Sequence, residues 1–142
     1  MQNYYNLIYR EEEREMIPYC HDTGVGLIPW SPIARGVLAR PFGDRGTTRE
    51  TTDNFLKSMI RNKETETDKA IVDRVEEVAK KMGVSMTGVS TAWCLSKGVI
   101  PIIGLGSKAR VEESVKNIGI KLDADDIAYL EDPYMPKHVQ GY

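Results

Sequence analysis

Short apolar runs alternate with longer amphipathic patterns along the whole chain. The apolar runs lie around Gln2, Ile28 and Ile102, and each is short enough to be a buried strand. Between and after them, apolar residues recur at helical spacing. Strands that alternate with helices in this way are typical of parallel βα units. We therefore predict an α/β fold with three parallel strands.

The most regular helical pattern spans residues 68–82. A capping arrangement at Thr65 and Asp68 precedes it, and Gly83 ends it. A second helix is predicted to begin after the cap Ser85, and a third follows the last apolar run. The apolar positions that define the buried faces of these helices are Ile71, Val75, Val78, Met82, Val89, Ala92, Trp93, Val111, Val115 and Ile118.

The remaining segments have weaker patterns. Residues 11–22 predict a short, irregular helix, because Pro18 must lie in its first turn or break it, and Gly24 is a plausible end. Residues 34–66 show only scattered apolar anchors, and we expect a long, weakly ordered functional loop or lid there. A short final helix begins at Asp123, and the proline-broken tail after it is expected to lie over a surface.

Three strands leave the predicted sheet with open edges. A (β/α)8 barrel needs eight strands to remove its edges, and a parallel sheet needs both of its faces covered. We therefore expect the chain either to be a piece of a larger barrel or to shield its edges by self-association.

Composition excludes several classes of partner. The 19 Lys+Arg are matched by 21 Asp+Glu and are not segregated, which argues against nucleic-acid binding. No apolar run approaches the length of a membrane span, and the N-terminal residues do not form the apolar core of a signal peptide. Cys20 and Cys94 lie far apart and belong to no metal-binding or CxxC pattern. These features predict a reduced, cytoplasmic protein.

The stretch from residue 99 to residue 110 is the most informative for chemistry. A buried strand leads into a turn that contains Gly104, and then into a helix whose first turn carries Ser107, Lys108 and Arg110. Unpaired amides at a helix N-terminus, together with two cations, suit a phosphate group. The same residues also fit an ordinary tight turn followed by an N-cap, because short motifs of this kind are not specific.

Trp30 and Ser31 stand just after the second predicted strand. In a barrel the carboxyl ends of the strands face the active site, so Trp30 is a candidate to stack on a flat ring. A core aromatic at a strand end is the plainer interpretation, because large aromatics are usually buried. Gln2 and Asn3 could hydrogen-bond an amide, although edge polarity explains them equally. No Ser–His–Asp set, carboxylate pair or metal cluster stands out in the sequence.

Several segments together resemble the C-terminal part of aldo-keto reductases: QNYYNLIYREEEREMIPYC, GVGLIPWSPIARGVLARP, GVSMTGVSTAWCLSKGVIPIIGLGSKARVEESV and YLEDPY. They occur in the right order, and the resemblance covers essentially the whole chain. It implies a partial TIM (β/α)8 barrel, with about the last three βα units, a C-terminal helix and a tail. Residues 1–142 would then be a single incomplete domain of a nicotinamide-dependent oxidoreductase.

The resemblance also implies an NADP(H) site. Gln2 matches the glutamine that contacts the nicotinamide carboxamide, and Trp30 matches the aromatic residue that stacks on the nicotinamide ring. Ser31, Ile33 and Arg35 match the loop that runs along the pyrophosphate.

At the adenosine end, the resemblance favours NADP(H) over NAD(H). Glu113 matches an acidic position near the adenine, and Ser114 stands where many family members have an asparagine. Gly104 stands where some members have a basic residue, so the phosphate would depend more on the cations that follow it. The segment that matches the family's binding site for the 2′-phosphate consists of Gly106, Ser107, Lys108 and Arg110.

The catalytic part of the family is not matched by this sequence. The family's Asp, Tyr, Lys and His belong to earlier strands, and a tyrosine with a pKa near 10 needs a placed Lys and His to donate a proton. The resemblance implies that the complete protein reduces aldehydes or ketones to alcohols by hydride transfer from the nicotinamide cofactor, with a small carbonyl substrate. The alternative is an inactive, truncated pseudoenzyme or binding module that needs a partner or self-association.

Overall fold

Three extended segments lie parallel to one another in the computed structural model, which describes residues 1–140. The segments are joined in chain order by backbone hydrogen bonds with N···O distances between 2.8 and 2.9 Å: Ile28 donates to Met1, Trp30 to Asn3, Ile100 to Leu27 and Ile102 to Pro29. The predicted parallel order is therefore confirmed. Within the described residues the parallel pairing takes the form of isolated bridges, Tyr4–Trp30 and Trp30–Ile102, and not of regular strands.

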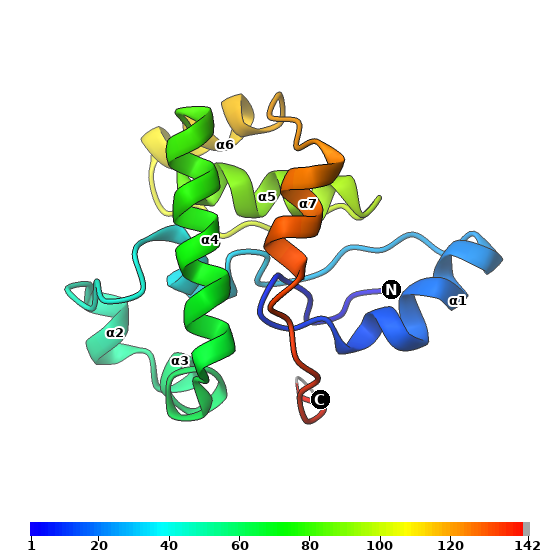
Figure 1. Cartoon of the computed structure of the whole chain (residues 1–142), viewed down its shortest axis with the longest axis horizontal. Coiled ribbons are helices and arrows are strands. Elements are labelled where there is room, and N and C mark those ends of the chain that lie inside the picture. Colours follow the sequence, from blue (N-terminus) through cyan, green and yellow to red (C-terminus); the bar gives the residue numbers. More distant parts are fainter. Residues whose placement is uncertain (141–142) are drawn as a thin grey trace.

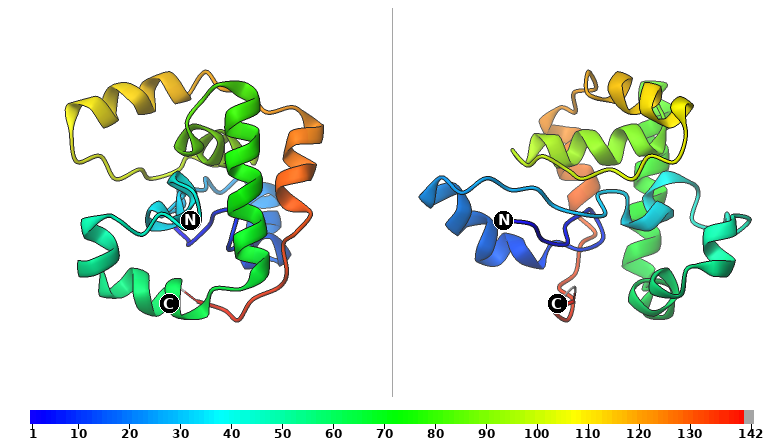
Figure 2. Two further views of the ribbon diagram at one scale, coloured as in Figure 1. Left: turned by 60° about the vertical axis from the view of Figure 1, so that its left-hand side comes forward. Right: turned by 180° about the vertical axis from the view of Figure 1, so that it is seen from behind.

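Successive side chains of the extended segments point to opposite faces. Leu27 and Val99 are buried, whereas their neighbours Ile28 and Ile100 are 41% and 70% exposed. Helices α4 (Glu66–Met82) and α7 (Ala124–Glu131) lie in front of the segments in Figure 1, with α5 (Met86–Ser96) running across behind them. Seen from behind, no helix of the described chain covers the segments (Figure 2).

The caps predicted for the later helices are confirmed, and the helix predicted over residues 68–82 begins slightly earlier, at Glu66. Thr65 and Asp68 form a capping box at the start of α4, and Gly83 ends that helix with a left-handed backbone, φ 67°. A glycine is favoured there because it has no Cβ to clash in that conformation. The side chains that cap the next helices are Ser85 for α5, Ser107 for α6 (Lys108–Asn117) and Asp123 for α7.

The first helical segment is as irregular as Pro18 predicts. It is divided into a 3-10 turn, η1 (Glu11–Arg14), and a helix, α1 (Met16–Thr23), with Pro18 in the first turn of α1. Proline is tolerated there because the first amides of a helix have no partner within it. Gly24 ends the helix with a left-handed φ of 72°.

The tail after α7 packs against the beginning of the chain, which confirms that it lies over a surface. The hydroxyl of Tyr134 donates to Glu11 at 2.6 Å, and the backbone amide of Lys137 donates to the same carboxylate at 2.7 Å. The ammonium group of Lys137 also pairs with the buried Asp68. Segments far apart in sequence are thereby tied together at the foot of α4 (Figure 1).

The expectation of weak order over residues 34–66 is wrong. This region contains η2 (Ala34–Ala39), α2 (Thr48–Thr52), α3 (Asn54–Met59) and η3 (Arg61–Lys63). These elements are too short to show an apolar period. Buried side chains of η2 and α3, such as Leu38 and Leu56, anchor the region to the core. Ion pairs add to this: Arg61 pairs with Glu50 and Glu64, and Arg35 pairs with Asp53.

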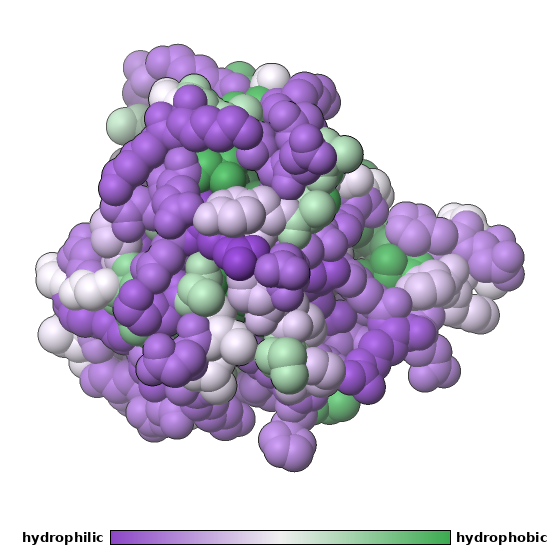
Figure 3. All heavy atoms as spheres, viewed as in Figure 1, coloured by the Kyte–Doolittle hydropathy of each residue, from purple (hydrophilic) through white to green (hydrophobic). Residues whose placement is uncertain are grey.

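The surface gives no sign of a membrane span. Across residues 1–140 no helix is both long and apolar enough to cross a bilayer. The face seen in Figure 3 is mainly hydrophilic, with small, separate apolar patches.

On α6 the predicted apolar face is not buried, because Val111, Val115 and Ile118 are 45%, 64% and 60% exposed. Self-association over such uncovered residues stays a prediction.

The burial pattern predicts the cost of truncating two residues from helical apolar faces. Ile71 on α4 is 1% exposed in the core, so Ile71→Ala should lower the free energy of unfolding by about 2–5 kcal/mol. Val115→Ala on α6 serves as the control, because its side chain is 64% exposed, and it should change stability by less than about 0.5 kcal/mol. Urea unfolding measures both. A large loss for Val115→Ala would mean that its face is covered in solution.

Candidate functional site

A cleft of about 860 Å³ lies at the carboxyl ends of the second and third extended segments. In α/β folds that end of the strands is where ligands bind. The walls of the cleft come from residues 33–40, residues 46–53, the start of α5, the turn 103–105 and α6.

The structure brings together part of the site predicted from the sequence. Ile33 and Arg35 line one wall of the cleft, and Arg110, Glu113 and Ser114 line the opposite wall from α6. These residues are about 75 positions apart in sequence, and the parallel order of the extended segments is what joins them. The other predicted residues lie outside the lining of this cleft: Gln2, Trp30, Ser31, Gly106, Ser107 and Lys108.

Trp30 lies between aromatic rings. Its ring stacks on Tyr4, with centroids 4.6 Å apart, and Phe55 approaches at 6.3 Å with a tilted ring. Trp30 is half-buried. Its buried part fits a core aromatic residue, and its exposed part leaves the stacking of a ligand ring open as an interpretation. Gln2 is exposed at the first extended segment.

The predicted phosphate segment is solvent-facing. Gly106, Ser107 and Lys108 are exposed, and Ser107 caps α6 by accepting a long hydrogen bond of 3.4 Å from the amide of Arg110. The side chain of Lys108 is 90% exposed and lies 3.7 Å from Glu112 one helical turn later. Among the described residues of this segment, Arg110 is therefore the cation that reaches the cleft wall.

The loop after the second extended segment has a strained backbone. Ser31, Ala34 and Arg35 have φ values of 57°, 47° and 54°, in the left-handed region that costs a residue with a side chain about 1–2 kcal/mol. Two side chains hold the loop: Asn6 Nδ2 donates to the carbonyl of Ser31 at 3.0 Å, and Arg49 Nη1 donates to that of Arg35 at 3.3 Å. Strain of this kind concentrates at binding and catalytic sites.

Arginine is the charged residue that dominates the cleft. Arg40 and Arg49 join Arg35 and Arg110 in its lining, against the carboxylates of Asp53 and Glu113. The sequence reasoning missed Arg40 and Arg49, because they lie in the stretch that was expected to be weakly ordered. The high density of arginines between residues 35 and 49 could have indicated that this stretch contributes to an anion site. An excess of guanidinium groups makes the cleft suited to an anion with several phosphates.

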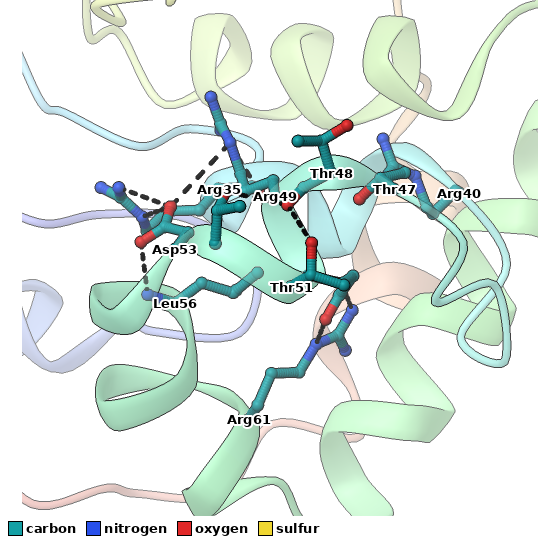
Figure 4. Close-up of polar contacts among 11 residues, drawn as sticks. Arg35, Arg40, Thr47, Thr48, Arg49, Thr51, Asp53, Leu56 and Arg61 are labelled. Carbon is teal, nitrogen blue, oxygen red and sulfur yellow. Dashed lines mark hydrogen bonds and ion pairs between the residues drawn. The ribbon is translucent and has the colours of Figure 1, made fainter.

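Asp53 connects two of these arginines (Figure 4). Its Oδ2 accepts hydrogen bonds from Nε and Nη2 of Arg35 at 2.9 and 2.7 Å, and Nε of Arg49 lies 3.9 Å away. Burial acts to raise the pKa of Asp53, but the amide of Leu56 and the guanidinium of Arg35 outweigh it, so the pKa is lowered. The group is therefore an anion at neutral pH.

Polar side chains also line the cleft beside the arginines. Glu113 accepts a hydrogen bond of 2.7 Å from the hydroxyl of Ser85, which joins α6 to the cap of α5. Arg40 Nη1 donates to the hydroxyl of Thr47 at 3.0 Å. Residues 33–40 are thus joined to residues 46–53, and α5 to α6, by hydrogen bonds between side chains.

Behind α2, an ion-pair cluster fixes the helix that carries Arg49. Arg61, which Figure 4 labels, is nearly buried. It pairs with both Glu50 and Glu64. The hydrogen bond from Arg61 lowers the pKa of Glu50, although burial opposes this. Arg45 extends the cluster by pairing with Glu64 at 3.0 Å.

Comparison with known proteins agrees with this arrangement. The sequence model described as "Aldo/keto reductase family" matches residues 1–134. A versiconal hemiacetal acetate reductase from Aspergillus parasiticus is 57% identical over 140 residues, which are 98% of this chain and 41% of that protein. The aldo-keto reductase dtxS3 from Metarhizium robertsii is 47% identical over 143 residues, 100% of this chain and 38% of that protein.

A solved structure gives the same fold. The glycerol dehydrogenase AKR11B4 from Gluconobacter oxydans superposes with a TM-score of 0.75 at 22% identity, covering 99% of this chain and 44% of that chain. The extended segments and helices described above therefore correspond to part of an aldo-keto reductase barrel. The chain spans about 40% of the length of the curated relatives it matches.

The Glu50–Arg61 pair predicts a pH-dependent contribution to stability. A carboxyl group whose pKa is lower in the folded state stabilises the fold above its unfolded pKa, about 4.3 for glutamate, and loses that contribution as the pH falls through the folded pKa. Glu50→Gln should therefore be less stable than the parent at pH 7, and the difference should shrink at pH 3. Urea unfolding at both values measures this, and a difference that is constant with pH would contradict it.

Proposed function

This chain belongs to the aldo/keto reductase family, and on that premise we propose that its cleft binds the phosphates and the adenosine end of NADP(H). The observation that carries the proposal is the meeting of Arg35, Arg40, Arg49 and Arg110 in one cleft at the carboxyl ends of neighbouring parallel segments. A cleft of about 860 Å³ also falls in the range of cofactor pockets, roughly 300–1,000 Å³.

The residues of the cleft fit the parts of the cofactor. Arg35 and Arg49 suit the pyrophosphate, because both line the cleft and both approach the same carboxylate, that of Asp53. Arg110 suits the 2′-phosphate, with Glu113 and Ser114 next to it for the adenosine. Gly106 and Ser107 precede α6 and Lys108 is its first residue, so this segment would border the 2′-phosphate next to Arg110.

The nicotinamide end of the proposed site lies nearer the first two extended segments. Gln2 would meet the carboxamide and Trp30 the ring, with Ser31 and Ile33 leading from them to the phosphates. The segments would be the sixth, seventh and eighth strands of the barrel, followed by the C-terminal helix and tail. When bound, NADPH supplies the hydride for reduction of a small carbonyl substrate by the complete protein.

A second candidate function is a binding module that is inactive by itself and is completed by a partner or by a second copy. The exposed Ile28, Ile100 and Ile102 favour it, because they form an apolar face that no helix of residues 1–140 covers. This candidate shares the proposed cofactor cleft and differs only in what completes the barrel.

Replacing Arg110 should separate the two cofactors. Arg110→Ala removes a charge-assisted contact to the 2′-phosphate, so NADPH should bind about tenfold more weakly or worse, whereas NADH binding should change by less than about twofold. Lys108→Ala is the matched control with a smaller expected effect, because that side chain is 90% exposed and does not line the cleft. Calorimetric titration of the 142-residue chain with each cofactor measures the difference. Equal weakening of both cofactors would remove the 2′-phosphate assignment.

The 142 residues by themselves should not turn over a substrate. They match none of the motifs that carry the family's catalytic Asp, Tyr, Lys and His, so a bound aldehyde would lack its proton donor. An assay of NADPH oxidation with aliphatic and aromatic aldehydes should give no rate above that of buffer. A rate that co-purifies with the chain and disappears in Arg110→Ala would show that catalytic groups were overlooked.

A further inference from the structure

Asp53 lies where α2 meets α3, in the wall of the arginine-lined cleft. Its Oδ2 receives hydrogen bonds from Nε and Nη2 of Arg35, at 2.9 and 2.7 Å, and lies 3.9 Å from Nε of Arg49. Its Oδ1 accepts from the amide of Leu56 at 2.9 Å and so caps α3. One carboxylate therefore performs two tasks with different oxygens, as Figure 4 shows.

Only one of these tasks needs a negative charge. Asparagine is as good an N-cap as aspartate, because a side-chain carbonyl accepts the same amide hydrogen bond. The pair of hydrogen bonds from Arg35 converges on one oxygen and is strong because both partners are ionised. The substitution Asp53→Asn therefore keeps the cap and weakens the grip on Arg35.

Without Asp53, little would fix the direction of the Arg35 guanidinium. The group packs over the ring of Phe55, 4.9 Å from its centroid, but Phe55 is itself 47% exposed. Arg35 is the more accessible member of the ion pair, with 29% of its side chain exposed against 12% for Asp53. Within residues 1–140 the third nitrogen of this guanidinium, Nη1, donates no hydrogen bond, so it can serve a ligand.

We propose that Asp53 is a positioning residue, which holds the Arg35 guanidinium against the cleft wall so that its remaining donor meets a diphosphate group. The proposal rests on the proposed cofactor cleft and adds a function for a residue of opposite charge within it. Arginine binds phosphates well when its planar group is already oriented, because less rotamer freedom is then lost on binding. The Arg49 guanidinium also lies near Asp53, with its Nε 3.9 Å from the same oxygen, Oδ2.

The sign of the effect distinguishes positioning from simple attraction. Removing a negative charge from the cleft should by Coulomb's law make an anion bind more tightly. If Asp53 positions Arg35, its replacement by asparagine should instead make the anion bind more weakly. If the anion binds more weakly after the negative charge of Asp53 has been removed, Asp53 acts by positioning Arg35.

The experiment is a double-mutant cycle on the 142-residue chain with Asp53→Asn, Arg35→Ala and the double variant. Each is titrated by calorimetry with inorganic diphosphate and with NADPH, after circular dichroism has shown that it is folded. Asp44→Asn is the matched control, because Asp44 is exposed in the same region and does not line the cleft. We expect Arg35→Ala to weaken diphosphate binding about tenfold and Asp53→Asn to weaken it several-fold. The double variant should bind no more weakly than Arg35→Ala.

Each other outcome is decisive. Binding by Asp53→Asn as tight as that of the parent, or tighter, would overturn the positioning role. A loss from Asp53→Asn that persists in the Arg35→Ala background would also overturn it, because Asp53 would then not act through Arg35. If the parent binds diphosphate with the expected coupling but not NADPH, the proposed function fails and the positioning role stands. If the folded parent binds neither, the cleft is no anion site and both fail.

Discussion

The parallel pairing of residues 1–4, 26–30 and 100–102 is the constraint on which the cleft depends. Because the segments run in the same direction, the loops that follow them leave at the same end, and residues 31–36 come to face residues 103–114. The alternation of side chains along each segment buries Leu27 and Val99 under the helices and keeps the register fixed. A slip by one residue would turn the buried side chains outward.

Ion pairs and apolar burial together order the outer wall of the cleft. Helix α3 buries Leu56 and Met59 in the core, whereas α2 has no buried residue. Pairs such as Arg35–Asp53 and Arg61–Glu50 hold α2 and the strained loop at residues 31–36. Of these two arginines, Arg35 also lines the cleft, whereas Arg61 lies outside its lining. Arg35 therefore serves both the structure of the wall and the proposed binding of an anion, and Asp53 is its partner in the ion pair.

Sequence patterns predicted the parts of the fold that depend on local chemistry. The caps Thr65, Ser85 and Asp123 and the terminating glycines at 24 and 83 are confirmed, because capping needs particular residue types at particular places. The short helices between residues 34 and 66 were missed, because ion pairs between distant residues leave no period in the sequence. For the same reason Arg40 and Arg49 were not predicted to join the site.

The cofactor roles of individual residues could not be predicted from sequence patterns and came from the resemblance to a family. The family itself is established. Lys108 and Arg110 are both exposed at the start of α6, and of the two only Arg110 is in the lining of the cleft. Their roles at the 2′-phosphate are proposals that come from the resemblance. The roles of Gln2 and Trp30 at the nicotinamide remain proposals of the same origin. The uncovered apolar face at Ile28 and Ile100 accords with a chain that spans about 40% of its curated relatives.

The most direct measurement is a titration of the isotopically labelled 142-residue chain with NADPH, followed by amide chemical shifts in ¹H–¹⁵N spectra. Binding in the cleft predicts that the shifted amides cluster in residues 33–53, at the start of α5 and in residues 103–114. Saturation of those shifts with one affinity would support a single cofactor site built by this chain. An unchanged spectrum of a folded chain, or shifts confined to the tail and α1, would contradict the proposed cleft.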